Sequence, residues 1–513
     1  MQVLTPSAVR ERVGFVVPRW TTTNPGLVRQ GIPFRCFPVA GSLYNHGFEV
    51  VYFDQELDLD LHDRFSELRK ELESCRIVFF WTNELWPQTQ YLNLILLIKH
   101  LKSWYPEIMI AVGGTLITVL PPEMFHVGGP VEFFIRGYGE HVCTDLMKAL
   151  DGDVRLEDVS GLVWRENGAH RHNAIGRSKR LQVDNNEILY RLLDLTDYIQ
   201  RGGIFGNDQG TFIIGTGQGC VKGCGFCVWR NDPPSLLRSE PIVNLVKFLR
   251  DRYGVLQYHL AELDLFTNRR RALALAKAWQ EQVPDCIWFA LVSPEDLLKF
   301  TDEELDFLVK GGCRKLEIGS ESGSAEILSA IGKGHTPEDT VILHRKLLDR
   351  GIHALYNFIF AFPGETEQDR RDSIKQIETL YRMDPLLVSF AFRILQAIPN
   401  TPIGDKALEK VDNFPETIDD IGAYRPLYSE YNARTMSWIE PDDERHIKRM
   451  VKYTLPIATS RLPCPNKTKE LLYRTLRRVA WWRLQRGFWT WEGLDERLYT
   501  WILGRSLSET YRP

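Results

Sequence analysis

The sequence lacks a strong excess of either charge. Its 63 lysine and arginine residues stand against 67 aspartate and glutamate residues, which gives a formal net charge of −4 over 513 residues. Proteins that bind DNA or RNA through the phosphates carry a clear basic surface. We therefore expect no nucleic-acid substrate. The arginines at positions 474, 477, 478 and 483 are interpreted as the solvated face of an amphipathic helix.

The chain also lacks any apolar run long enough to cross a bilayer, and its first residues show no basic segment followed by an apolar core. We expect a cytoplasmic protein with no membrane association. Hydrophobic residues make up 44% of the chain and charged residues 25%, which is the composition of globular proteins rather than of disordered ones. The length suffices for two or three packed domains.

Cysteines are few, and their spacing does not suggest disulfide pairs. The nine cysteines stand at positions 36, 75, 143, 220, 224, 227, 286, 313 and 464. An odd number with a single tight group argues against a disulfide framework and favours metal binding in a reducing compartment.

Short apolar runs alternate with helical patterns over residues 1–150 and predict a doubly wound parallel sheet with the flavodoxin-like layout. The expected strands are 13–18, 49–54, 76–81, 108–113 and 132–136. Such sheets bind ligands at the carboxyl ends of their strands. Three ends carry distinctive residues, which are Trp81, Thr82, Asn83 and Glu84, then Gly113, Gly114 and Thr115, then Gly137, Tyr138, Gly139 and Glu140. Glycines alone would favour tight turns, but their recurrence at these ends favours a ligand site.

The remaining chain divides into three further segments. Residues 151–205 are expected to be a connector with one hairpin, in which Asn167 and Gly168 form a type I′ turn. Residues 206–405 alternate strands and helices again and predict six βα units, a partial barrel. The expected strands there are 211–215, 257–262, 287–291, 315–319, 354–359 and 387–391. Residues 406–513 are expected to be mainly helical, with most of their tryptophans in the core.

The strongest motif is Cys220-x3-Cys224-x2-Cys227, placed just after the first predicted barrel strand. Thiolates are the usual ligands of iron–sulfur clusters, and a short loop lets three of them reach one cluster. Three protein ligands leave one iron of a [4Fe-4S] cluster open for a substrate. Structural zinc is the alternative, but zinc sites normally pair two cysteines with a second distant pair or with histidines, and the sequence has no such pair.

This cysteine loop resembles that of the radical S-adenosylmethionine (SAM) superfamily, and the aromatic Phe226 fits the same pattern. The resemblance implies that the open iron chelates SAM and that an electron cleaves it to a 5′-deoxyadenosyl radical. Ser320 and Glu321 stand where that family contacts SAM from its fourth strand, and Glu262 stands at an acidic strand end. For Glu262 a helix cap or an ion pair is an equal alternative.

The order of an N-terminal doubly wound sheet followed by this barrel resembles the cobalamin-dependent radical SAM enzymes. That resemblance implies three cofactors: a [4Fe-4S] cluster, SAM and cobalamin, the last held by the N-terminal strand ends. It also implies a methyltransferase in which one SAM methylates cobalamin and another supplies the radical that activates a substrate carbon. We expect a small-molecule substrate and an electron donor such as flavodoxin or ferredoxin. No catalytic side chain is identified.

Three other interpretations remain open at this level. Some members of that family cyclise or rearrange their substrates instead of methylating them. A methylthiotransferase would bind a second cluster through Cys36, Cys75 and Cys143, although the settings of these residues favour buried thiols. A non-enzymatic sensor would use the cluster only to report oxidation. The SAM-type strand ends argue against the sensor.

Overall fold

The computed structural model describes most of the chain. The described residues are 1–19, 33–55, 61–82, 88–125, 130–167, 169–176, 183–199, 210–411, 414–421, 436–460, 466–487 and 494–503. They form two compact units, which we call unit 1 and unit 2. Unit 1 comprises Met1–Val221, Asn231–Ala261 and Phe414–Pro426, and unit 2 comprises Lys222–Arg230, Glu262–Asn413 and Leu427–Pro513.

Unit 1 is built on an eight-stranded sheet with the order β1-β3-β2-β4-β5-β6-β7-β8. The strands are β1 (Gln2–Leu4), β2 (Arg12–Val17), β3 (Glu49–Asp54), β4 (Ile77–Thr82), β5 (Met109–Gly114), β6 (Phe133–Ile135), β7 (Leu162–Glu166) and β8 (Ala169–His172). Strands β3-β2-β4-β5-β6 are parallel, and their order is the flavodoxin-like one that the sequence predicts. The predicted hairpin is present as β7 and β8, and it extends this sheet past residue 150 because β7 pairs with β6.

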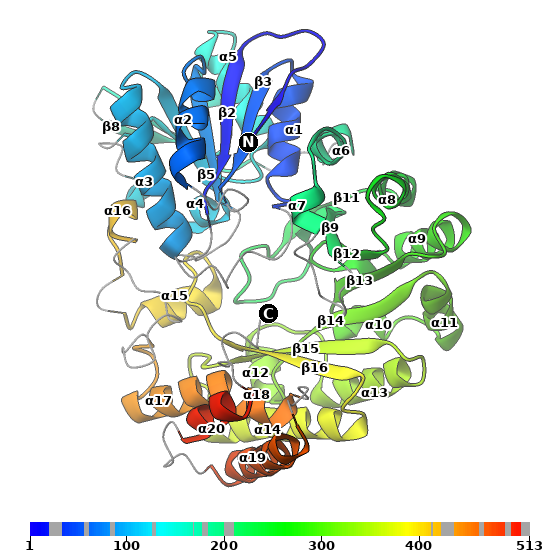
Figure 1. Cartoon of the computed structure of the whole chain (residues 1–513). Helices are drawn as coiled ribbons and strands as arrows, with labels where there is room; N and C mark the ends of the chain where they lie inside the picture. Colours follow the sequence, from blue (N-terminus) through cyan, green and yellow to red (C-terminus); the bar gives the residue numbers. More distant parts are fainter. Residues whose placement is uncertain are drawn as a thin grey trace. The chain divides into compact units, whose positions relative to one another are not determined.

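Helices cover both faces of this sheet, as Figure 1 shows for α1 on one side of β2 and β3 and for α2 and α3 on the other. The helices of this layer and of the connections are α1 (Phe37–Asn45), α2 (Leu61–Leu72), α3 (Gln88–Trp104), α4 (Thr115–Val119), η1 (Pro122–Met124), α5 (Glu140–Leu150), η2 (Leu156–Asp158), α6 (Val183–Leu192) and α7 (Thr196–Ile199). Side chains alternate between the faces. Val16 of β2 belongs to a core that includes Leu68 of α2 and Leu97 of α3. Phe15, on the other face, stacks on Tyr52, whose ring meets Phe37 of α1.

A second sheet has the strand order β16-β15-β14-β13-β12-β9 and holds the six predicted barrel strands. They are β9 (Thr211–Gly215), β12 (Gln257–Ala261), β13 (Ile287–Val292), β14 (Cys313–Glu321), β15 (His353–Phe360) and β16 (Val388–Ile394). Each pairing described between them is parallel. Between them lie α8 (Ser239–Tyr253), η3 (Leu265–Thr267), α9 (Arg269–Gln282), α10 (Pro294–Leu297), α11 (Asp302–Lys310), α12 (Ala325–Ala330), α13 (Pro337–Leu348) and α14 (Glu367–Met383).

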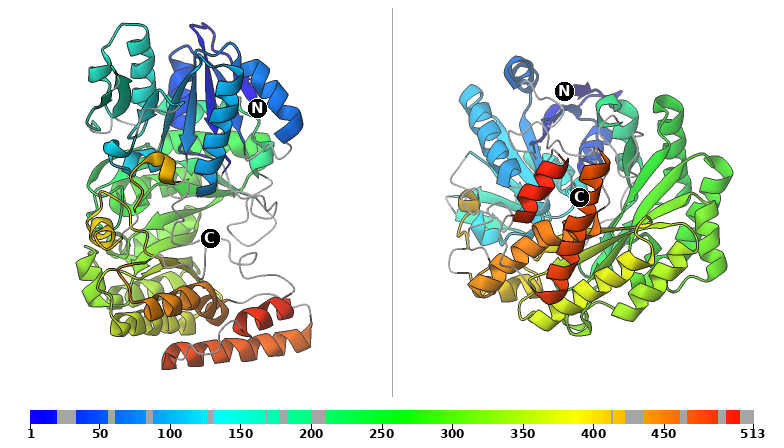
Figure 2. Two further views of the ribbon diagram at one scale, coloured as in Figure 1. Left: turned by 90° about the vertical axis from the view of Figure 1, so that its left-hand side faces the viewer. Right: turned by 60° about the horizontal axis from the view of Figure 1, so that its bottom comes forward.

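The C-terminal region is helical, as predicted. It consists of α15 (Pro402–Leu408), α16 (Ile418–Ile421), α17 (Pro441–Arg449), the π-helix η4 (Met450–Thr454), α18 (Leu455–Thr459), α19 (Lys467–Arg486) and α20 (Leu494–Leu503). Helices α19 and α20 lie side by side (Figure 2). Trp438 is buried, but Trp482 and Trp501 are exposed, so the prediction of a tryptophan core holds only in part. Trp489 and Trp491 lie outside the described residues. None of the described helices has the length and apolar character needed to cross a membrane.

Candidate functional site

The first predicted cluster ligand, Cys220, stands at the end of a short strand that follows β9. This strand, β10 (Gly217–Cys220), forms an antiparallel hairpin with β11 (Asp232–Leu236), and Cys220 lies opposite Asp232 in the register. Gly219 has φ +78, and a Cβ atom there would come within 2.7 Å of the Pro233 carbonyl oxygen. The glycine before the first cysteine is therefore required by the hairpin itself.

The other two cysteines lie on the loop between the hairpin strands, in unit 2. A turn joins them, because the Cys227 N–H donates to the Cys224 carbonyl at 3.1 Å. The backbone of Gly225 makes two hydrogen bonds to other parts of unit 2. Its N–H donates to Ile331 O at 2.8 Å, and its carbonyl accepts from Ile403 N at 2.9 Å. Gly225 thus belongs to a tightly held loop.

No three His, Cys, Asp or Glu side chains among the described residues converge as ligands of one metal ion. What fits an iron–sulfur cluster here is the chemistry of the donor set and the form of the loop. Three thiols lie within eight residues, and at least two of them are turned together by the loop backbone.

A largely buried cation, Lys333, lies beside this loop. Its Nζ bonds to Glu321 Oε1 at 3.0 Å and to Gly319 O at 3.2 Å, and it stands 5.8 Å from the centre of the Phe226 ring. Burial alone lowers the pKa of Lys333, but the charges of Glu321, Cys224 and Cys227 outweigh burial and raise it. Lys333 is therefore a permanent positive charge close to two predicted cluster thiolates. Such a charge favours an anionic cluster.

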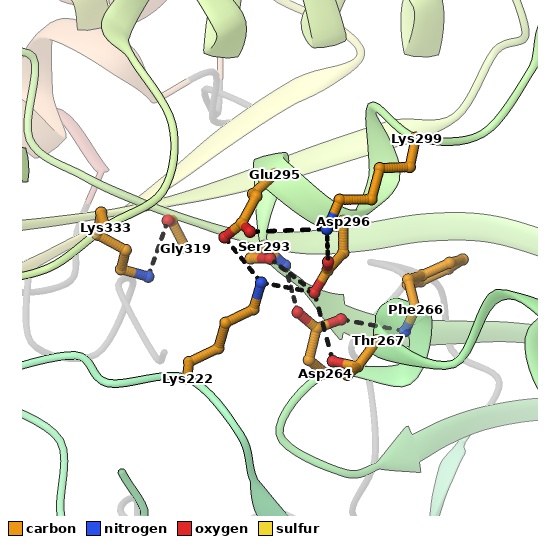
Figure 3. Close-up of polar contacts among 10 residues, drawn as sticks. All are labelled: Lys222, Asp264, Phe266, Thr267, Ser293, Glu295, Asp296, Lys299, Gly319 and Lys333. Carbon is orange, nitrogen blue, oxygen red and sulfur yellow. Dashed lines mark hydrogen bonds and ion pairs between the residues drawn. The ribbon is translucent and has the colours of Figure 1, made fainter. Parts of the chain in front are cut away.

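A second lysine, Lys222, fixes the same loop to α10. Its Nζ lies 2.8 Å from Glu295 Oε2 and 2.8 Å from Asp296 Oδ2, as Figure 3 shows. Burial acts to lower the pKa of Lys222. The two carboxylates raise this pKa by more, so the net shift is upward. Lys299 approaches the same carboxylates from the other side, 2.7 Å from Asp296 Oδ1. The loop between the first two cysteines is thus held by an ion-pair network.

Next to this network lies the buried carboxyl of Asp264. It accepts hydrogen bonds from Phe266 N at 3.0 Å and Ser293 N at 3.1 Å (Figure 3). Burial and the negative charge of Asp296 raise the pKa of Asp264. The pKa of Asp296 is lowered, because its bonds to Lys222 and Lys299 outweigh its own burial. Of the two acids, Asp264 is therefore the one that holds a proton more strongly.

Glu262 forms an ion pair, which is one of the alternatives that the sequence left open for it. Both of its carboxylate oxygens accept from Arg271, each at 2.8 Å, and its side chain is only 1% exposed. A bidentate arginine engages both oxygens of the carboxylate. The contact that the resemblance implies between Glu262 and SAM stays a prediction.

Ser320 and Glu321 differ in what they face. The Ser320 hydroxyl is buried against Thr340 of α13, at 3.3 Å, so it faces the helix layer. Glu321 ends β14 with φ +63 and points its carboxylate at Lys333. Only Glu321 of this pair lies with the cysteine loop.

In the N-terminal sheet, the glycines at the strand ends make room for an indole. A Cβ atom on Gly113 would lie 2.2 Å from the Trp81 ring, and one on Gly139 would lie 2.0 Å from it. Trp81 is 3% exposed and stacks on Phe15 at 6.3 Å. These two glycines are therefore explained by internal packing, which sequence reasoning did not foresee.

The other predicted residues of these strand ends make local bonds. Thr82 Oγ1 donates to Gly113 O at 3.2 Å, and Gly114 has φ +116 with no space for a Cβ atom beside Thr82. Thr115, which begins α4, is buried. Asn83 and Glu84 lie outside the described residues. The register pairs Trp81 with Gly113 and Gly113 with Ile135, so the ends of β4, β5 and β6 form one level edge. A level edge of parallel strand ends suits a flat ligand.

The last of these ends, Gly137–Glu140, reaches the hairpin of Cys220. The Tyr138 hydroxyl donates to Asp232 Oδ2, and Gln218 Nε2 donates to Glu140 Oε1 at 2.8 Å. Burial first, and then the bond to Asp232, raises the pKa of Tyr138 well above its usual value. Tyr138 and Glu140 therefore have protein partners on β10 and β11.

Lys222 and Lys333 are the residues that sequence reasoning missed. Lys222 lies inside the cysteine motif, and this position is the signal from which sequence reasoning could have identified it. Lys333 lies 106 residues after Cys227, and only the packing of the loop on the end of α12 brings it there.

The chain is similar in sequence to several known proteins. A sequence profile described as the radical SAM superfamily matches residues 214–377. An uncharacterised methyltransferase of Pyrococcus horikoshii is 28% identical over 287 residues, which is 54% of this chain and 59% of that protein. The anaerobic magnesium-protoporphyrin IX monomethyl ester cyclase of Cereibacter sphaeroides is 22% identical over 442 residues, 83% of this chain and 66% of that protein. The matched part thus spans less than two thirds of either relative.

Two solved structures share the fold along nearly the whole chain. The cobalamin-dependent radical SAM enzyme OxsB matches with a TM-score of 0.69 at 15% identity, covering 92% of this chain and 72% of that one. The radical SAM methyltransferase TsrM from Kitasatospora setae matches with a TM-score of 0.64 at 16% identity, covering 96% of this chain and 99% of that one. At these identities the likeness concerns the fold.

Proposed function

We propose that this chain, which carries a radical SAM domain and has the fold of cobalamin-dependent radical SAM enzymes, is a methyltransferase acting on a carbon atom of a small molecule. In this proposal Cys220, Cys224 and Cys227 hold a [4Fe-4S] cluster, and the edge formed by β4, β5 and β6 holds cobalamin. When bound, the cluster would cleave SAM to a radical and cobalamin would carry the methyl group.

The observation that carries the proposal is the cysteine loop with its two lysines. Lys222 anchors the loop to α10, and Lys333 places a largely buried positive charge beside Cys224 and Cys227. Structural zinc sites with cysteine ligands are closed by four protein ligands, and this loop offers three. Three thiolates with adjacent cations suit a cluster that keeps one iron open.

The cobalamin part rests on architecture. The flavodoxin-like order puts the ends of β4, β5 and β6 at one edge, and ligands of such sheets bind there. The TsrM structure, described as having cobalamin and a [4Fe-4S] cluster bound, shares the fold over 96% of this chain. The protein's own contribution would be to hold the two cofactors and keep water away from them.

For the substrate, we propose a small molecule or a natural-product intermediate. The net charge of −4 gives no general attraction for a polyanion. The reaction also needs electrons from outside the chain, so an electron donor such as flavodoxin or ferredoxin is part of the proposal.

The test is product analysis on anaerobically reconstituted protein with SAM, a strong reductant and candidate substrates. The proposal expects 5′-deoxyadenosine and S-adenosylhomocysteine to form together, with about four iron atoms and one cobalt atom per chain. The Cys224→Ala variant is the matched control and should form no 5′-deoxyadenosine. If the parent protein forms none either, the radical SAM assignment fails.

A second candidate is a cyclase or another rearrangement enzyme of the same fold. The observation in its favour is that the magnesium-protoporphyrin cyclase aligns over 83% of this chain, against 54% for the Pyrococcus methyltransferase. The same experiment separates the two. Formation of 5′-deoxyadenosine without S-adenosylhomocysteine favours rearrangement.

A further inference from the structure

The hairpin that contains Cys220 is a short two-stranded ribbon formed by β10 and β11. Its register joins Gly217 with Leu236, Gln218 with Ser235 and Cys220 with Asp232, with an irregularity between Gln218 and Cys220. Strand β11 also contains two prolines, Pro233 and Pro234, which have no backbone N–H to donate. A two-stranded ribbon of this length is not stable alone. Other parts of unit 1 must therefore hold it.

The turn Gly137–Glu140 supplies these contacts. The Tyr138 hydroxyl donates to the carboxylate of Asp232, the residue directly opposite Cys220. Glu140 accepts from Gln218 at 2.8 Å. One turn thus binds both strands of the hairpin, at Gln218 of β10 and at Asp232 of β11, close to the first predicted cluster ligand.

The turn is itself firmly attached to the sheet of unit 1. The Gly137 N–H donates to Thr118 Oγ1 at 2.9 Å, and that hydroxyl donates to Gly114 O at 2.8 Å. Gly139 lies against the Trp81 ring, and Glu140, the first residue of α5, is 3% exposed. A bond to this turn is therefore a bond to the ends of β4 and β5.

We propose that Tyr138 and Glu140 are positioning residues for the cluster, because they fix the hairpin of Cys220 to the N-terminal sheet. The inference rests on the proposed function in so far as Cys220 is a cluster ligand. It gives these two side chains a role distinct from the cobalamin contact that the sequence suggested for them. It also makes the strand-end edge proposed for cobalamin and the first cluster ligand parts of one hydrogen-bonded assembly.

The test compares Tyr138→Phe, Asp232→Ala and the double variant with the parent protein. Hydrogen–deuterium exchange of peptides covering 217–236 is measured first, since it needs no cofactor. Loss of the Tyr138 bond should speed exchange there about ten-fold, while the rest of unit 1 stays unchanged. On reconstituted protein, iron release to a chelator should also be faster by about ten-fold. The double variant should resemble either single one, because all three lack the same bond.

Two controls complete the design. Tyr105→Phe removes another tyrosine hydroxyl of unit 1, which bonds to Arg69 O at 3.0 Å, and should change neither readout. Asp232→Asn keeps an acceptor for Tyr138 and should restore most of the protection. Unchanged exchange in both single variants would overturn the inference, and so would faster exchange spread over all of unit 1. A parent protein that binds no iron would defeat the proposed function, while the exchange data would still decide this inference.

Discussion

At the scale of single residues, Glu365 is a buried acid with an unusual proton affinity. It follows β15, and its Oε2 accepts from Ala361 N at 2.7 Å. Its Oε1 is buried and has no hydrogen-bond partner among the described residues. Burial raises the pKa of Glu365 to about 8, with Arg370 3.9 Å away acting in the opposite sense. The folded protein therefore keeps a proton that the unfolded chain releases near pH 4.5, the ordinary pKa of a glutamate.

The raised pKa of Glu365 makes the free energy of unfolding depend on pH. A raised pKa in an acid means that stability is highest below the unfolded pKa and falls as pH rises towards the folded value. For Glu365 the loss is at most about 1.4 kcal/mol per pH unit between about pH 4.5 and 8. Glu365→Gln should remove that part of the slope when urea unfolding is measured from about pH 5 to about pH 9. Glu367→Gln, at an exposed position two residues on, should keep the parent's slope. Equal slopes in all three proteins would contradict the assignment.

Lys222 and Lys299 form a matched pair, because both bond to Glu295 and Asp296 but differ in exposure. The Lys222 side chain is 20% exposed and that of Lys299 is 59% exposed. Lys222→Met should lower the free energy of unfolding by about 1–3 kcal/mol, since it leaves buried Asp296 short of a partner. Lys299→Met should cost less than about 1 kcal/mol. Denaturant unfolding of the two variants checks this, and similar losses would mean that burial of the pair has no effect.

At the scale of elements, two glycines with similar positive φ angles have different reasons to be glycine. Gly139 has φ +80 with the Trp81 ring 2.0 Å from a Cβ position, and Gly152 has φ +84 with nothing within 4 Å. Gly152→Ala should cost about 1–2 kcal/mol for the backbone alone. Gly139→Ala should cost about 1–3 kcal/mol more, because the indole must move. Adding Trp81→Leu to Gly139→Ala should recover part of that difference, and a strictly additive double variant would show that the ring is not the cause.

The strands were predictable because their residues carry the information locally. The expected strand 49–54 is β3 as found, and 211–215 is β9, since runs of β-branched and aromatic residues bounded by polar ones specify buried parallel strands. Helix starts such as Thr301 before α11 are also local, because the Thr301 hydroxyl and Glu304 form a capping box.

Other features depend on contacts between distant residues and could not be predicted in this way. Strand β11 begins with Asp232, Pro233 and Pro234, a composition that argues against a strand until its partner β10 is known. The glycines at 113 and 139 suggested an open ligand cradle, but Trp81 from a neighbouring strand occupies that space. The position of the cysteine motif was predictable, whereas the carboxylates that bind Lys222 and the approach of Lys333 to the loop depend on the tertiary fold.

At the scale of the whole molecule, two of the three proposed cluster ligands belong to a different unit from the edge proposed for cobalamin. The edge proposed for cobalamin is formed by β4, β5 and β6 of unit 1, which has its own core. Cys224 and Cys227 belong to unit 2. Cobalamin binding should therefore survive the loss of the cluster. Cys224→Ala is expected to bind less than about a tenth of the parent's iron and to form no 5′-deoxyadenosine, yet to keep most of its cobalt after reconstitution with hydroxocobalamin.

The matched control for that experiment is Cys143→Ala, which removes a buried thiol of α5 in unit 1. Burial raises the pKa of Cys143 well above its usual value, so this thiol is a poor metal ligand. The variant should keep about four iron atoms per chain and the parent's cobalt, measured by atomic emission on the same preparations. A parent with about eight iron atoms that falls to about four in Cys143→Ala would instead favour a second cluster on Cys36, Cys75 and Cys143, and with it a methylthiotransferase. Loss of cobalt together with iron in Cys224→Ala would show that the two cofactors are held as one site.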